Sequence, residues 1–115
     1  MRLLYSTAFK RQLRDLAKRY RNIRSDLKSV LEQLAAGETP GDQVPNIGYT
    51  VYKVRAANRD ARRGKSGGYR ILYYLQTDTD RLLVTVYSKS DQGDVPAAEL
   101  RQIIEATEEQ SPGSG

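Results

Sequence analysis

The sequence predicts an α+β domain in which helices pack against one antiparallel sheet. Apolar residues recur at helical spacing in the first third of the chain and again near its end, and stretches with strand-like alternation lie between them. The later strand-like stretches follow one another directly, which is typical of antiparallel pairing. The expected element order is β-α-α-β-β-β-α, with two N-terminal helices and a short C-terminal helix.

The first third of the chain contains the expected first strand and both N-terminal helices. Residues 2–5 alternate as in a short strand. Either Ser6 or Thr7 can cap the first helix, because both side chains accept a hydrogen bond from a free backbone N–H. A second helical pattern covers residues 23–34. The polar residues between the two patterns leave open an α-hairpin or one bent helix.

The middle of the chain is expected to form three strands, at residues 50–56, 69–76 and 81–88. These stretches are rich in β-branched and aromatic residues. Residues 77–80 are expected to connect the last two strands as a hairpin turn. Residues 58–68 form a polar, basic loop that ends in Gly67-Gly68, where glycine permits a tight turn into the next strand.

The last helix is expected to begin at Pro96, since proline suits the first turn of a helix. A chain of 115 residues can bury one core, so we expect one domain over residues 1–110 and a flexible tail at 111–115. No apolar run approaches the 18 or so residues of a membrane span, and the N-terminal apolar run is too short for a signal peptide. A cytoplasmic protein with no membrane partner is therefore expected.

The chain has no cysteine and no histidine. The absence of cysteine excludes disulfides, thiolate zinc sites and cysteine nucleophiles. The absence of histidine removes the usual metal ligand and the usual general base near neutral pH. Metalloproteases, Ser-His-Asp hydrolases and nucleases with a histidine pair are therefore excluded. We expect no metal site and no cofactor.

The formal net charge of +5 is unevenly distributed. Residues 1–37 hold nine Lys or Arg against three Asp or Glu, residues 49–76 hold seven against one, and residues 91–115 hold one against six. A concentrated positive field is typical of a protein with a polyanionic partner, most often a nucleic acid. The first block could also be the solvated face of amphipathic helices. That interpretation suits the second block less, because its charges lie in a strand and a loop.

Four basic residues in the second half of the chain are candidates for one site. Lys53 and Arg55 project from the same side of one predicted strand. Arg70 lies at the start of the next strand, and Lys89 lies just beyond the end of the third. If the three strands are neighbours, these cations converge on one patch. A core cannot hold them unpaired, so they must face solvent, an acidic partner or a polyanionic substrate.

Three segments carry a resemblance to known proteins: 52–55 (Tyr-Lys-Val-Arg), 65–74 (Lys-Ser-Gly-Gly-Tyr-Arg-Ile-Leu-Tyr-Tyr) and 86–89 (Val-Tyr-Ser-Lys). They resemble the RelE/HigB group of bacterial type II toxins, in the RelE/ParE superfamily. The HigB-like branch is the most similar, since its members carry a Gly-Lys-x-Gly-Gly-x-Arg-hydrophobic-x-Tyr-Tyr run. The similarity spans residues 2–109 and implies a RelE-like fold.

The resemblance implies a ribosome-dependent endoribonuclease, an mRNA interferase that cleaves translated mRNA. Such cleavage needs a base for the 2′-OH, stabilisation of an extra-negative phosphorane, and protonation of the departing 5′-oxygen. By resemblance, Arg70 holds the scissile phosphate, and Lys53 or Lys89 acts as the base, its pKa lowered by neighbouring cations. Arg55 or Lys65 then stabilises charge and neutralises the leaving group.

Further contacts to RNA are expected around these residues. In the family, a tyrosine near the start of the last helix stacks on a substrate base, but residues 94–96 contain no aromatic side chain. The resemblance therefore leaves Tyr69 or Tyr87 for this role. The basic loop adds three expected RNA contacts, Arg62, Arg63 and Lys65.

Each candidate also has a simpler structural interpretation. The basic strand residues could be ordinary surface charges, and Lys89 could be a solvated loop residue. Arg70 could form a salt bridge with Asp91 or Asp94. The tyrosines could be packing residues.

Two other functions stay open besides the nuclease. A ParE-like toxin of the same fold inhibits DNA gyrase by binding and cleaves nothing, and a domain with decayed catalysis would only bind RNA or DNA. If the toxin is inhibited by a partner that covers its basic groove, that antitoxin is expected to have acidic or apolar segments. The expected partners are a cognate antitoxin of the helix-turn-helix type, mRNA and the ribosome.

Overall fold

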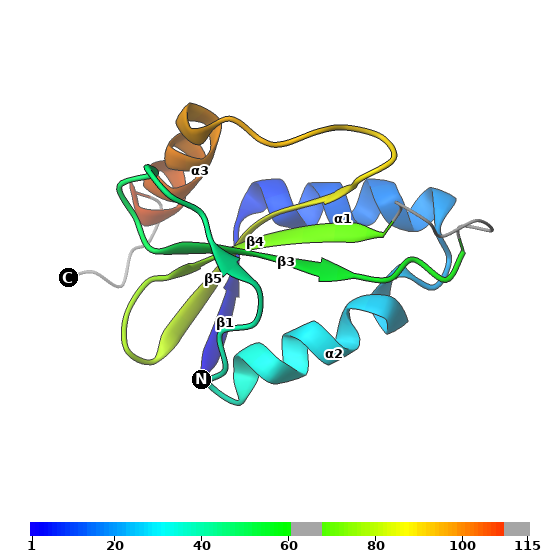
Figure 1. Ribbon diagram of the computed structural model, residues 1–115, viewed down its shortest axis with the longest axis horizontal. Coiled ribbons are helices and arrows are strands. Elements are labelled where there is room, and N and C mark those ends of the chain that lie inside the picture. Colours follow the sequence, from blue (N-terminus) through cyan, green and yellow to red (C-terminus); the bar gives the residue numbers. More distant parts are fainter. Residues whose placement is uncertain (61–67, 110–115) are drawn as a thin grey trace.

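The computed structural model describes residues 1–60 and 68–109, and within them five strands and three helices form an α+β fold (Figure 1). The strands are β1 (Arg2–Tyr5), β2 (Asp42–Gln43), β3 (Val51–Ala56), β4 (Tyr69–Leu75) and β5 (Asp80–Ser88). The helices are α1 (Thr7–Arg19), α2 (Ile23–Ala35) and α3 (Ala97–Glu109). The predicted fold class is therefore confirmed. The tail expected at 111–115 lies outside the described residues.

The sheet is mixed, whereas the sequence predicted an antiparallel one. Its described strands follow the order β1-β5-β4-β3-β2. β3, β4 and β5 pair antiparallel as expected, but β1 lies parallel to β5, with Leu4 opposite Leu82. β2 was not predicted, since its two residues lie in a segment with loop composition, and it pairs with Tyr52 and Lys53. Both differences involve strands too short to show a partner or a direction in their own residues.

Helices cover both faces of the sheet, and Figure 1 shows α2 and α3 on opposite sides. α1 and α2 are two separate helices that form a hairpin, and they pack on one face with Ile71 and Tyr73 of β4. α3 packs on the other face with Leu72 of the same strand. This alternation follows from the two-residue period of a strand. None of the described helices is long and apolar enough to cross a membrane.

Ser6, rather than Thr7, caps α1. Its buried hydroxyl accepts a hydrogen bond from the backbone N–H of Phe9 at 2.9 Å and donates one to the carbonyl of Val84 in β5 at 2.7 Å. The same side chain therefore caps the N-terminus of α1 and holds this helix against the sheet.

We expect Ser6→Ala to lower the free energy of unfolding by about 1–3 kcal/mol, because it removes the cap and leaves a buried carbonyl without its donor. Thr7→Ala is the matched control, since Thr7 is exposed and is expected to change stability by less than about 0.5 kcal/mol. Urea denaturation measures both values. An equal loss in the two variants would contradict the role of Ser6.

Candidate functional site

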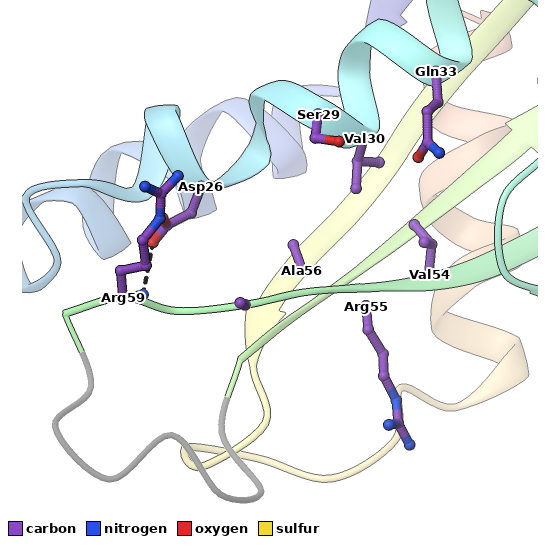
Figure 2. Close-up of a pocket in the computed structure, with 9 residues that line it drawn as sticks. Asp26, Ser29, Val30, Gln33, Val54, Arg55, Ala56 and Arg59 are labelled. Atoms are coloured by element: carbon purple, nitrogen blue, oxygen red, sulfur yellow. Dashed lines mark hydrogen bonds and ion pairs between the residues drawn. The ribbon is translucent and has the colours of Figure 1, made fainter.

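A row of polar side chains crosses the sheet on the face that α3 partly covers. The strand register places Arg55 of β3 opposite Arg70 of β4, and Arg70 opposite Tyr87 of β5. Residues that oppose each other across strands share a face, and Lys53 shares the face of Arg55 because it lies two residues away. Figure 2 shows Arg55 pointing away from α2, on the side of β3 opposite to Val54. Two adjacent strands, β3 and β4, thus present three cations on one face, and β5 adds Tyr87.

Lys89 joins these cations from the end of β5. Its backbone N–H donates to the carbonyl of Gly68 at 2.9 Å, which places it beside the start of β4. Gly68 has a φ of 93°, and a Cβ there would lie 2.8 Å from the carbonyl oxygen of Ala56. The tight turn expected at Gly67-Gly68 is therefore present at Gly68, and Gly67 lies outside the described residues. Below, Lys53, Arg55, Arg70 and Lys89 are called the cation cluster.

Asp94 brings a carboxylate to the cation cluster. Lys53 Nζ donates a hydrogen bond to Asp94 Oδ1 at 3.1 Å. This contact lowers the pKa of Asp94 below its usual value, and the charges of Lys89 and Arg70 lower it further. Three members of the cluster, from three separate segments of the chain, therefore act on one carboxylate.

The two arginines of the cluster repel each other across the strands. Arg55 and Arg70 are directly opposed, and like charges in this position destabilise a sheet. Neither forms a salt bridge with any carboxylate in the described part of the chain. The salt bridge considered for Arg70 is not formed, because Asp94 pairs with Lys53 and Asp91 pairs with Arg19 at 2.8 Å. Paired guanidinium groups favour an anion with several oxygens, such as a phosphate.

The two tyrosines proposed for base stacking are both buried. Tyr69 is 0% exposed and lies in the core on the opposite face, where its ring makes an edge contact with Tyr20. It cannot stack on a base there, so this expectation is wrong for the described fold. Tyr87 lies on the face of the cation cluster but is only 4% exposed. Burial raises the pKa of its hydroxyl, which the charges of Lys53 and Arg70 partly oppose.

Beside the cluster lies a pocket of about 230 Å³. Lys53, Tyr87 and Asp94 contribute to it, together with apolar side chains such as Leu72 and Val95. Tyr87 and Lys53 of the cation cluster therefore line the same pocket. Because Tyr87 is buried, it forms part of the pocket wall and does not present an open face on which a base could stack.

The basic loop contains three of the expected RNA contacts, Arg62, Arg63 and Lys65, and all three lie outside the described residues. The first residues of this loop are held against α2 and the residue before it. The buried carboxylate of Asp26 accepts hydrogen bonds from Arg59 Nε at 2.8 Å and from its backbone N–H at 3.0 Å (Figure 2). Asp60 likewise accepts from the backbone and side-chain N–H groups of Asn22.

Sequence reasoning missed the role of Asp26, and it considered Asp94 only as a partner of Arg70 and not of Lys53. Each is an ordinary acidic residue in its local pattern, and its basic partner lies more than 30 positions away in the chain. No local signal identifies such a pair. Within residues 1–60 and 68–109, no group of three or more acidic side chains is placed to hold a metal ion.

The fold and the site together define a small α+β domain with a cluster of cations on one face of its sheet. Residues 3–93 match the model of a family described as the ParE toxin of the type II toxin-antitoxin system, parDE. The chain belongs to this family, so it is the toxin of such a system and has a cognate antitoxin as its partner. The predicted membership of the RelE/ParE superfamily is confirmed, whereas the HigB-like branch is not. No individual curated protein matches the chain.

Proposed function

We propose that this toxin is an mRNA interferase that cleaves translated mRNA at the cation cluster. The observation that carries the proposal is the cation cluster itself, in which Arg55 lies directly opposite Arg70 and Lys53 binds a carboxylate on the same face. A surface that only binds a protein needs no such focus of positive charge, whereas a phosphoryl-transfer site does. The opposed arginines support the same proposal, because a phosphate bound between them would relieve their repulsion.

In the proposed reaction, the 2′-oxygen of one nucleotide attacks the adjacent phosphorus and the bond to the 5′-oxygen breaks. The products are a 2′,3′-cyclic phosphate and a 5′-hydroxyl. Lys53 or Lys89 takes the proton of the 2′-OH, and Arg70 holds the phosphate oxygens as negative charge builds up. Arg55 or Lys65 neutralises the departing 5′-oxygen, which takes a proton from water, and the protonated lysine returns its proton to the solvent. No metal ion takes part in this scheme.

The family description favours a second candidate, inhibition of DNA gyrase by binding. In that case the basic face would recognise a protein surface, and no covalent step would follow. The experiment adds the purified toxin to a reconstituted translation reaction and to a gyrase supercoiling assay. We expect cleavage of mRNA only while ribosomes translate it, and unchanged supercoiling. Loss of supercoiling with intact mRNA would establish the gyrase inhibitor instead, and no effect in either assay would leave only a binding domain.

The antitoxin is proposed to be a helix-turn-helix protein with an acidic or apolar segment that covers the cation cluster. On the opposite face of the sheet, a groove of about 300 Å³ between α2 and β3 offers the same protein a second surface for binding (Figure 2). Val30, Val54 and Ala56 contribute apolar surface to it, whereas the Arg55 side chain points away from α2 toward the cation cluster. Because its proposed substrate is translated mRNA, the toxin is proposed to act in the cytoplasm.

A further inference from the structure

Asp94 is an unexpected residue to find in a site proposed to bind phosphate. It lies in the connection between β5 and α3, at residues 89–96, which contains no helix or strand. This connection crosses over the sheet in Figure 1. It brings a negative charge to Lys53 at 3.1 Å, and the charges of Lys89 and Arg70 also act on that carboxylate. The connection therefore carries an anion of its own into the cation cluster.

The contact is built so that it can open. The Asp94 side chain is 75% exposed and that of Lys53 is 36% exposed. Ion pairs at such positions are weak, because water screens them and two side chains must be held in place. A carboxylate and a phosphate oxygen also make the same kind of hydrogen bond to an ammonium group. A phosphate that binds several members of the cluster at once can therefore displace Asp94.

We propose that Asp94 is a tethered counterion, which occupies the phosphate position of the cation cluster in the free toxin and leaves when RNA binds. The proposal rests on the proposed function, because it takes RNA as the ligand of the cluster. Its consequence is selectivity. A single phosphate gains little binding free energy when it replaces a carboxylate that is already in place. An RNA strand that contacts several cations at once gains more. Asp94 thus lowers the affinity of the free toxin for RNA that is not correctly positioned.

Asp91 provides a matched control within the same connection. Its carboxylate accepts hydrogen bonds from both terminal nitrogens of Arg19, at 2.8 and 3.1 Å, on α1. Asp91→Asn and Asp94→Asn remove the same formal charge and each releases one cation. Only Asp94→Asn releases a cation of the cluster. The difference between the two variants therefore separates local competition from the general effect of a more positive protein.

The test measures binding of a fluorescent, single-stranded 2′-O-methyl oligoribonucleotide, which cannot be cleaved because its 2′-oxygen is blocked. We expect Asp94→Asn to tighten binding by about fivefold, the upper end for one exposed ion pair. Asp91→Asn is expected to tighten it by less than about twofold. The difference should shrink in high salt, since both ion pairs and phosphate contacts are screened. Thermal unfolding checks that both variants are folded.

Equal gains in the two variants would overturn the proposal, and so would weaker binding by Asp94→Asn, which would mean that Asp94 positions Lys53 for RNA. The proposed function is judged separately by the translation assay. Tighter binding by Asp94→Asn without mRNA cleavage by the unmodified toxin supports the tethered counterion and contradicts the nuclease. Cleavage of mRNA by the unmodified toxin, together with an equal gain in RNA affinity in both variants, would support the nuclease and contradict the tethered counterion.

Discussion

Arg70→Ala should lower the rate of mRNA cleavage by about 10²–10³-fold and leave the fold intact. The expected size is that of removing one preorganised donor to a developing negative charge. Arg70 lies between Arg55 and Tyr87 in the row across the sheet, and it forms no salt bridge with a described carboxylate. Its removal therefore costs the fold no ion pair, and it relieves the repulsion between two opposed arginines.

The measurement is cleavage of a translated mRNA, with growth arrest in cells as the second readout. Arg14→Ala is the matched control, because Arg14 is an exposed arginine on α1, away from the cation cluster. Arg70→Lys should restore only part of the activity, since lysine keeps the charge but not the two-pronged contact to phosphate. Growth arrest that persists in Arg70→Ala, with mRNA left intact, would remove the nuclease and favour the gyrase inhibitor.

Gly41→Ala should lower the free energy of unfolding by at least about 3 kcal/mol. Gly41 has a φ of 92°, a conformation that side chains other than glycine rarely adopt. A Cβ there would lie 2.2 Å from the carbonyl oxygen of Lys53 and 2.9 Å from Cα of Val54. These are backbone atoms of β3, so the clash can be relieved only by moving the chain around β2 away from the sheet.

Gly48→Ala is the matched control for this prediction. Its φ is 88°, almost the same as that of Gly41, but no atom lies within 4 Å of the position of its Cβ. It should therefore cost only the backbone strain, about 1–2 kcal/mol. Urea denaturation of both variants separates the free-energy cost of the steric clash from that of the backbone strain. Similar losses would show that the close approach to Lys53 does not constrain the fold.

The helices and the three central strands could be predicted because their signals are local. Phe9 and Leu16 lie seven positions apart and share the buried face of α1, as the helical period requires. Lys53 and Arg55 share a face of β3 because the strand period is two. The neighbouring order of β3, β4 and β5 followed because strands consecutive in the chain usually pair, and β4 and β5 are joined by a short turn. These same local rules led to the candidate cations of the site.

The direction of β1 and the burial of Tyr69 were decided by contacts between residues far apart in the chain. The parallel pairing of β1 with β5 joins positions 78 residues apart, such as Leu4 and Leu82, and no property of a four-residue strand determines its direction. The burial of Tyr69 depends on α1 and α2 covering its face, which the ring itself does not reveal.

The amino-acid sequence alone determined the types of every described element except β2, the absence of histidine and cysteine chemistry, and which cations lie on one side of a strand. Only the tertiary structure decided which carboxylate meets those cations. Asp91 and Asp94 are three residues apart and chemically identical, yet one pairs with Arg19 and the other with Lys53. The physical reason is that an ion pair depends on distances of a few ångströms, and these are set by the packing of the whole chain.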